Sequence, residues 1–477
     1  MKKTWLAVLA LPVIAYPAAS WYLGKQVQNN LDKQYAQLEA LPYAKVVERS
    51  YERGLFAATE TVTIEFFGDM MRSMAANLPA GAEAPEPVRL TFNSAIAHGP
   101  FAAGLSAAVI DSELVLPEDV QAETRKLFGD AKPLTAHTVI KLDGSGSSAV
   151  KSPAFNAPMP AVDGGEPGQF AWEGLDVSVD FSSDMKRYTM DGTAPKLEIR
   201  DGQGVHMVMT GMKLVGDQTR VFEDDPFLYA GTQNFTLEQM QISGPELEGE
   251  PVTLKDLRYD VSLPLKGDYL DMSARISAQV VQVGDFNFGP ARYDFSFEHL
   301  HARTVSSLYK AMMAMYSDPA VFTGEGDPAE AMSALAGPAM ALLQHDPVLR
   351  LDQLSFNTPS GEAMVNAEAR LPGLTPEEAG NPMIMIGKLQ ASGSVVLPEQ
   401  MMRELMLNRT QSQLTMMDPE ATLTEEQIDM VNAQLDMQLE QFASQGYIDR
   451  TDGLIKARIA FSQGQLTVND KPFNPGR

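Results

Sequence analysis

Cysteine is absent from the 477-residue sequence. Its absence excludes disulfide bonds, thiolate zinc sites, iron–sulfur clusters and cysteine nucleophiles. It does not identify the cellular compartment, because an exported protein that is large enough to bury a core does not need disulfides. The composition, with 44% hydrophobic and 21% charged residues, is that of a folded globular protein.

Motifs of catalysis and nucleotide binding are also missing. The sequence has no Walker A loop, no G-x-S-x-G nucleophile elbow, no H-E-x-x-H pair and no EF-hand loop. The segment 201–204 comes nearest to a dinucleotide-binding loop, but Met207 stands where a third glycine would be needed. A short G-x-G between strands is typical of a turn. We therefore expect no cofactor and predict no catalytic residue.

Positive charge is scarce, with 37 basic residues against 62 acidic ones and a formal net charge of −25. A body this acidic is repelled by phosphate backbones, so we expect no nucleic-acid partner. The same acidity favours solubility.

Long hydrophobic runs are limited to one, over residues 5–23, which follows Lys2 and Lys3. As a helix rising about 1.5 Å per residue it would reach about 28 Å, close to the hydrocarbon thickness of a bilayer. The small residues Ala18 and Ser20 also suit a cleavable signal peptide. The run is therefore compatible both with a retained membrane anchor and with a cleavable signal peptide.

The flank of this run favours a retained anchor. Trp21 and Tyr22 stand where an interfacial aromatic belt belongs, and Lys25 follows them. We predict a signal anchor over residues 1–24 and a juxtamembrane helix over residues 25–44. The two lysines before the run orient the amino terminus inside and the body outside.

The body opens with a strand-rich region over about residues 45–298. Apolar residues alternate there with polar ones, as in Leu175, Val177, Val179 and Phe181. This period of two predicts antiparallel strands with one buried and one wet face. The segment 151–168 is rich in proline, glycine and alanine and is predicted to be a loop.

Helical spacing appears in two later blocks. In order, the pattern predicts helices over about 299–345, strands over 349–397, helices over 398–445 and a hairpin over 454–470. Thr424 and Gln427 fit a capping box, and Gly446 suits a C-cap. Without regular strand–helix alternation, we predict an α+β fold. It comprises a single body, residues 45–477, with a long, mainly antiparallel sheet, two helical blocks packed on it and a preceding membrane helix.

His299 and His301 are the one closely spaced histidine pair. Alternate positions on a strand would place both imidazoles on one face, an arrangement that metal sites use. Glu298 is the single adjacent carboxylate, and no third ligand can be named. We therefore predict no metal site and expect both histidines to be dispensable.

Methionine is abundant, with 27 residues, many of them near the helical blocks. Such residues either fill a core between helix and sheet or offer an adaptable apolar surface. Some lie outside the cleanest helical periodicity and are candidates for an apolar groove that takes an acyl chain or an apolar partner segment: Met401, Met402, Met406, Met416 and Met417.

Three stretches carry a family resemblance: residues 49–56 (RSYERGLF), 98–100 (HGP) and 461–469 (FSQGQLTVN). With the N-terminal run and Gly24, they resemble the YdgA/YihF-like family of bacterial envelope proteins, a domain of unknown function. The sequence departs from the family pattern at Ala57, Ala58 and Asp470. The resemblance implies an inner-membrane-anchored periplasmic protein and no established activity.

The leading hypothesis is a non-enzymatic binding or scaffold protein for lipid or an envelope partner. Two alternatives stay open: an envelope hydrolase with an unrecognised Ser/His/carboxylate site, and a structural subunit that forms a homo-oligomer. An open apolar groove would favour the binding or scaffold protein. A polar pocket with converging histidine and carboxylate would favour the hydrolase.

Overall fold

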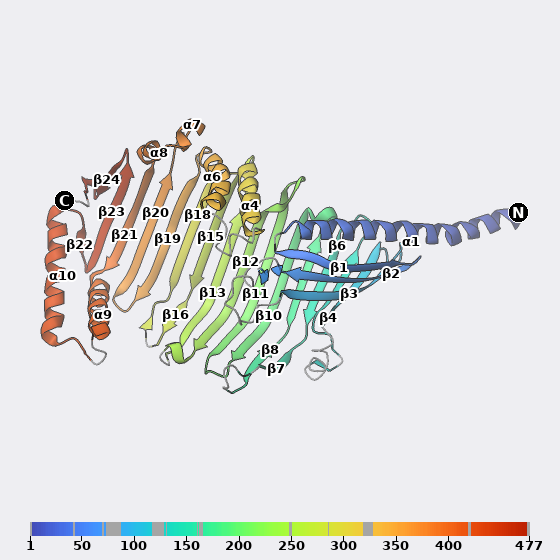
Figure 1. Ribbon diagram of the computed structural model, residues 1–477, viewed down its shortest axis with the longest axis horizontal. Helices are drawn as coiled ribbons and strands as arrows, with labels where there is room; N and C mark the ends of the chain where they lie inside the picture. The colour runs from blue at the N-terminus through green and yellow to red at the C-terminus, as the bar shows by residue number, and fades with distance from the viewer. Residues whose placement is uncertain are drawn as a thin grey trace. The chain divides into compact units, whose positions relative to one another are not determined.

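The computed structural model describes residues 2–41, 43–68, 71–72, 87–116, 128–129, 131–159, 161, 166–247, 250–284, 286–317, 328–417 and 421–474. Of these, residues 2–15, 246, 316–317, 328–332 and 416–417 are described by their backbone alone. The fold is α+β and mostly antiparallel sheet, which confirms the fold class predicted from the sequence (Figure 1).

Contacts divide the chain into two compact units. The first comprises Met1–Gln203, Val208–Phe235 and Ala302–Ala339. The second comprises Gly204–Met207, Thr236–His301 and Met340–Arg477. Each unit therefore combines segments that are distant in the sequence.

The first unit begins with helix α1 (Lys2–Glu39), which runs unbroken through the predicted anchor and the predicted juxtamembrane helix. Among the residues described here, no helix combines the length and the apolar character that a membrane span requires.

An antiparallel sheet follows in the first unit. Its strands are β1 (Ala44–Arg53), β2 (Ala57–Phe66), β3 (Val88–His98), β4 (Ala108–Val115), β5 (Thr135–Ile140), β6 (Gly146–Ser152), β7 (Phe155–Met159), β8 (Gly168–Trp172), β9 (Leu175–Phe181) and β10 (Arg187–Arg200). Pairing gives the order β1–β2–β3–β4–β5–β6–β9–β10, in which β7 continues β6 and β8 continues β9, so that β8 and β9 lie end to end along the same edge of β10. Two long strands come next in sequence, β11 (His206–Phe222) and β12 (Asp225–Ser243).

Strand β7 lies inside segment 151–168, so the prediction of a loop there is wrong in part. Phe155 pairs with Trp172 of β8, and its ring lies 5.5 Å from that of Phe170. The proline that obscured the pattern, Pro158, is tolerated because β7 pairs with β8 alone among the described strands, so that one side of the strand needs no ladder hydrogen bonds.

Helix α1 packs on the apolar face of this sheet. Val27 contacts a buried cluster that includes Ala58, Ile96, Ala108 and Ile110. Ala58, Ile96 and Ile110 face one another across β2, β3 and β4, so they form one row under the helix. Burying a side chain the size of isoleucine stabilises a fold by about 1.5–3 kcal/mol, which makes this row the main apolar anchor of α1.

The second unit is also built on antiparallel strands. Its strands are β13 (Val252–Leu263), β14 (Leu265–Lys266), β15 (Tyr269–Ala278), β16 (Val280–Val283), β17 (Phe286–Asn287), β18 (Ala291–His301), β19 (Val348–Thr358), β20 (Gly361–Arg370), β21 (Gln390–Pro398), β22 (Asp449–Thr451), β23 (Leu454–Ser462), β24 (Gln465–Val468) and β25 (Lys471–Pro472). The main order is β13–β15–β18–β19–β20–β21–β23–β24–β25.

The remaining helices are α4 (Ala302–Ser317), α6 (Pro328–Leu343), α7 (Pro376–Ala379), α8 (Pro382–Lys388), α9 (Glu399–Met417) and α10 (Glu425–Gln445), with short 3-10 turns at Ser183–Met185 and Pro245–Leu247. The predicted capping box of Thr424 and Gln427 is confirmed, as is the left-handed C-cap at Gly446. The predicted C-terminal hairpin is also confirmed, with Gly464 at positive φ in its turn.

Candidate functional site

One face of the second unit's sheet carries three apolar rows across β18, β19, β20, β21 and β23. The rows are Tyr293–Leu354–Val365–Val395–Ala457, Phe295–Leu351–Ala367–Gly393–Ile459 and Phe297–Leu349–Ala369–Ala391–Phe461. Because side chains alternate between the two faces of a strand, these residues share one face. We name this surface the apolar trough.

The size of the side chains along the second and third rows produces the hollow. Aromatic residues on β18 and leucines on β19 form one bank, and Ile459 and Phe461 on β23 form the other. The floor between them, on β20 and β21, is built mainly from alanine and glycine. At Gly393 a Cβ atom would lie 2.6 Å from the carbonyl oxygen of Asn366, so the floor cannot accept a side chain there without a backbone shift.

The trough encloses a volume of about 700 Å³, within the usual range of ligand pockets. Its banks are open to solvent, with Tyr293 at 42%, Leu349 at 46% and Ile459 at 40% exposure. A contiguous exposed apolar surface on a soluble domain marks a site for binding or association.

Helices α9 and α10 close one end of the trough. Ile455 lies on the same face of β23 as Ile459, and it packs against Leu435 and Leu439 of α10. Its partner across the strands is Leu397, two residues along β21 from the first row. The helices therefore cover the sheet face directly beyond that row.

The methionines named from the sequence belong to this helical cover. Met401 is buried, and Met402 and Met406 pack against the cluster of Leu435, Leu439 and Ile455. The side chains of Met416 and Met417 lie outside the described residues. The methionines therefore support the closed end, while the hollow itself lies over β20 and β21. Alternating small residues at 367–369 and 391–393 were the sequence signal for that hollow.

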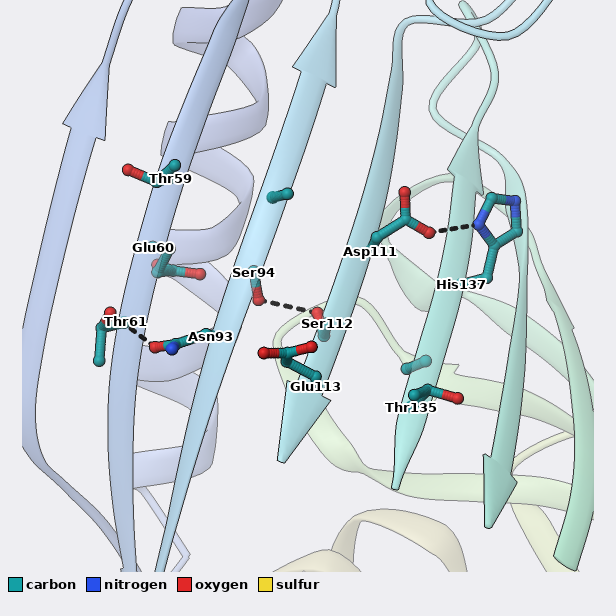
Figure 2. Close-up of a pocket in the computed structure, with 12 residues that line it drawn as sticks. Thr59, Glu60, Thr61, Asn93, Ser94, Asp111, Ser112, Glu113, Thr135 and His137 are labelled. Carbon is teal, nitrogen blue, oxygen red and sulfur yellow. Dashed lines mark hydrogen bonds and ion pairs between the residues drawn. The ribbon is translucent and has the colours of Figure 1, made fainter. Parts of the chain in front are cut away.

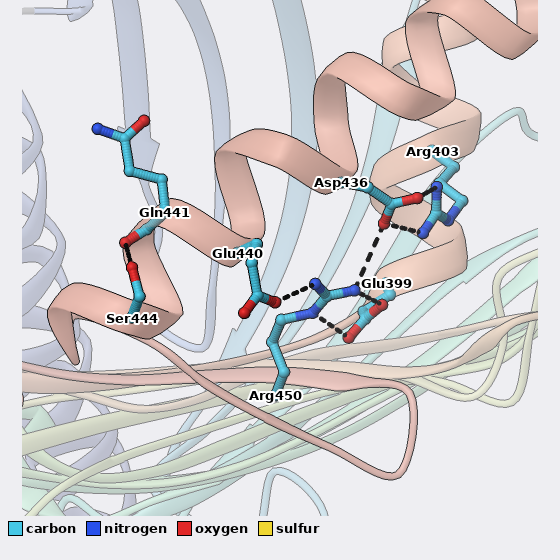
Figure 3. Close-up of polar contacts among 7 residues, drawn as sticks. All are labelled: Glu399, Arg403, Asp436, Glu440, Gln441, Ser444 and Arg450. Atoms are coloured by element: carbon cyan, nitrogen blue, oxygen red, sulfur yellow. Dashed lines mark hydrogen bonds and ion pairs between the residues drawn. The ribbon is translucent and has the colours of Figure 1, made fainter.

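An ion-pair network fixes α9 and α10 to strand β22 (Figure 3). Arg450 donates two hydrogen bonds, of 2.9 and 2.8 Å, to the carboxylate of Glu399. Arg403 of α9 binds Asp436 of α10 at 2.5 Å. Hydrogen bonds from Arg450 hold the pKa of Glu399 below its usual value, and those from Arg403 do the same for the pKa of Asp436.

The first unit offers a different, polar hollow over strands β2–β5 (Figure 2). Asp111 and His137 are joined there by a 2.6 Å hydrogen bond, the arrangement of a base and the group that orients it. Ser94 and Ser112 instead bond each other at 2.7 Å. Asp111 and Ser112 are neighbours on β4, so their side chains point to opposite faces, and neither serine is placed to be activated by His137.

A second candidate for hydrolysis joins Ser306, Lys310 and Asp225. The Ser306 hydroxyl donates to Asp225, and Lys310 lies 3.3 Å from the same carboxylate. Ser306 and Asp225 are 3% and 1% exposed, which closes this group to a substrate. The arrangement anchors α4 to β12.

Three histidines gather around Tyr269. Its ring stacks on His299 with centroids 3.9 Å apart, and His301 stacks on His345 at 4.1 Å. His299 has positive φ beside an irregularity in the pairing of β15 and β18, so the pair does not occupy a regular strand face as predicted. Burial, and then the two other histidines, lower the pKa of His345. The described residues contain no group of three or more histidines and carboxylates arranged to hold a metal ion.

Two of the three stretches that carry the family resemblance, residues 49–56 and 98–100, lie where α1 contacts its sheet, and the third, residues 461–469, forms the β23–β24 hairpin of the second unit. Arg49 donates to Asp32 at 2.6 Å and to Glu60 at 2.7 Å, and Tyr35 donates to Glu60 at 3.1 Å. Burial, and then the Glu60 carboxylate, raise the pKa of Tyr35 well above its usual value. These contacts give the motif of residues 49–56 a role in holding α1 to the sheet.

A family model described as a bacterial protein of unknown function, DUF945, matches residues 1–476. The chain belongs to this family. It is also similar to Protein YdgA of Escherichia coli (strain K12), with 23% identity over 519 aligned residues that cover 99% of this chain and 95% of YdgA. The resemblance noted from the sequence is thereby confirmed. No solved structure matches the chain.

Proposed function

We propose that this DUF945 protein is a non-enzymatic binding protein that holds the acyl chain of a lipid in the apolar trough. The observation that carries the proposal is the order of side-chain sizes in the second and third rows, large on β18 and β19, small on β20 and β21, and large again on β23. A packed core does not require the smallest residues to lie in adjacent rows between two exposed banks of large residues.

The width of the trough suits a hydrocarbon chain. Strands β19 and β23 are three strand spacings apart, about 14 Å, and their leucine and isoleucine side chains narrow that gap. An α-helix with its side chains is about 10–12 Å wide and fits such a space poorly. A single acyl chain fits, and each buried CH₂ group contributes about 0.8 kcal/mol to its affinity.

We further propose that the protein is held at the bacterial inner membrane by its N-terminal segment, with the body in the periplasm. The apolar run over residues 5–23, its basic flank and the belt of Trp21 and Tyr22 support this placement. A lipid of the same membrane is then the nearest source of an acyl chain. The acidic body argues against nucleic acid as a partner.

The test fills the floor of the trough. The variant carrying Ala367→Leu and Ala391→Leu adds bulk where the chain would lie, so the affinity for a pyrene-labelled hexadecanoate should fall about tenfold or more. Ser392→Leu is the matched control, because it adds a leucine to the opposite face of β21 and should leave the affinity unchanged. Native mass spectrometry of the purified full chain should also detect bound lipid.

Equal probe affinity in the filled and control variants, together with no copurified lipid, would overturn the proposal. Photo-crosslinking from Phe295 in living cells separates the remaining alternatives. Crosslinks to a different protein would favour a partner segment as the occupant, and crosslinks to a second copy of this chain would favour the oligomeric subunit.

A further inference from the structure

Turns at one end of the first unit's sheet carry exposed apolar side chains. The pairs Ala57–Ala97 and Ala108–Ile140 show that the β1–β2, β3–β4 and β5–β6 turns lie at the same end of the antiparallel strands. We name the exposed residues in them the apolar turns: Leu55, Phe56, Phe101, Leu105 and Leu142. Leu105 and Phe101 are 74% and 62% exposed, values that are costly for such side chains in water.

Helix α1 meets the sheet at this same end. The ring of Tyr16 stacks on Phe56 with centroids 5.7 Å apart and on Phe101 at 6.0 Å. Toward the amino terminus, α1 projects beyond the ends of strands β1–β3 (Figure 1). The apolar turns therefore lie beside the point where the N-terminal hydrophobic run leaves the sheet.

Close packing fixes the position of α1 along its axis relative to these turns. His98 Nδ1 donates to the carbonyl oxygen of Ser20 at 2.9 Å, and both residues are fully buried. A Cβ at Gly24 would lie 2.5 Å from His98 Cε1, and one at Gly99 would lie 2.5 Å from Ser20 Oγ. The helix cannot slide along the sheet without breaking this contact, so the turns and the helix act as one rigid edge.

The helix surface at this edge has the composition of a membrane interface. Trp21 and Tyr22 are exposed, and the ring of Trp21 lies between two cations, Arg53 at 5.4 Å and Lys25 at 5.9 Å. Aromatic rings with a polar edge, flanked by lysine or arginine, prefer the headgroup region of a bilayer.

We infer that the apolar turns and this part of α1 form a collar that inserts into the headgroup region of the bilayer, about 5–10 Å deep. The inference rests on the proposed anchoring of the N-terminal segment. A lipid surface is the occupant that fits, because the collar lies beside the base of the one apolar run long enough to enter a bilayer. The net charge of −25 keeps the rest of the body away from anionic lipid, so the collar makes contact end-on.

The natural absence of cysteine allows a direct test in the full chain. Single variants Phe101→Cys, Leu105→Cys and Leu142→Cys carry a nitrobenzoxadiazole fluorophore in vesicles of phosphatidylethanolamine with a minority of phosphatidylglycerol. A nitroxide near the headgroup end of the acyl chains should quench more than half of the emission at these sites, and aqueous iodide should quench little. Val88→Cys, at the opposite end of the same sheet and also exposed, is the control and should show the reverse.

A label at Ala10→Cys separates failure of the collar from failure of the anchor. Quenching of that label by a nitroxide deep in the bilayer, with the turn labels still open to iodide, overturns the collar and leaves the anchor standing. Quenching at the turns without quenching at Ala10 supports the collar and overturns the anchor. Turn labels that are shielded from both quenchers are covered by protein, which also overturns the collar.

Discussion

Glu60 shows how one buried side chain organises the contact between α1 and its sheet. Its carboxylate is 2% exposed and receives hydrogen bonds from Arg49 and Tyr35. Arg49 also reaches Asp32 on α1, and its guanidinium lies 4.6 Å from the ring of Tyr35. A charge that is buried this deeply is tolerated because it is paired, so the pairing is a condition for α1 to remain in place.

Replacement of Arg49 should therefore be strongly destabilising. Arg49→Ala leaves the Glu60 carboxylate buried without its cation, and we expect the free energy of unfolding of the first unit to fall by about 3–5 kcal/mol. Urea denaturation followed by tryptophan fluorescence measures it, because Trp5, Trp21 and Trp172 all belong to the first unit. Arg187→Ala is the control, because the pair of Arg187 and Asp217 is exposed and solvent screens it, so its loss should change the stability little. Similar losses in both variants would contradict the role assigned to Glu60.

Helices α9 and α10 stabilise the second unit through a small apolar seam and a polar clasp. Met402 and Met406 pack in the seam against Leu435, while Met430 and Met437 of α10 are exposed. The clasp of Arg450, Glu399 and Asp436 holds the start of α9. The methionines of the two helices named here thus have opposite environments.

Truncation of a seam methionine distinguishes the two environments. Met402→Ala removes partly buried apolar contacts and should lower the free energy of unfolding of the second unit by about 2 kcal/mol. Met430→Ala, at a position that is 63% exposed, should change it by about 0.5 kcal/mol or less. Thermal melts of the two variants make the comparison. An unchanged melting temperature for Met402→Ala would show that its side chain is on the surface and contributes no packing.

Acid should release α9 and α10 before the sheet unfolds. The folded pKa of Glu399 lies below its ordinary value of 4.5, so the stabilisation is complete above pH 4.5 and is lost as the pH falls toward the lowered pKa. Asp436 acts in the same direction from an ordinary value of 3.8. Hydrogen exchange of residues 425–445 should accelerate in this acid range. In Glu399→Gln most of that acceleration should disappear, since the titrating partner of Arg450 is gone; an identical acid response would assign the effect to other carboxylates.

Local features of the fold could be predicted from the sequence, and long-range ones could not. The capping box at Thr424 and the hairpin turn at Gly464 depend on residues within a few positions of one another. The trough depends on the pairing register that brings Phe295 and Ile459 into one row. The alternation of apolar and polar residues within a single strand does not determine that register. Bulges, such as the one between Leu351 and Leu354, shift it further.

Charge acts on the molecule as a whole. A formal net charge of −25 produces self-repulsion that opposes the compact state, while ion pairs oppose that repulsion locally. Most of the ion pairs in the described residues have an exposed partner, so each contributes little. Repulsion should therefore dominate the response to salt.

Raising the ionic strength from about 0.01 M to about 0.1 M shortens the screening length from about 30 Å to about 10 Å and should raise the melting temperature. Calorimetry across a sodium chloride series measures the effect. An equal osmolarity of sucrose gives the baseline for changes unrelated to charge. A melting temperature that falls with salt would show that the ion pairs outweigh the repulsion.

The bank of the trough on β23 has a consequence for the order in which the chain is synthesised. Helix α1 and strands β1–β4 are complete once residue 115 has been made, so they can assemble early at the ribosome. The second bank, Ile459 and Phe461, comes far later in the sequence, after α10 has ended at Gln445. A nascent chain therefore carries an open-sided sheet, with its leucines and aromatics uncovered, until residues 459–461 have been made. A ribosome that stops before them releases a chain that folds at its beginning, lacks one bank of the trough, and presents an apolar strand edge to chaperones and proteases.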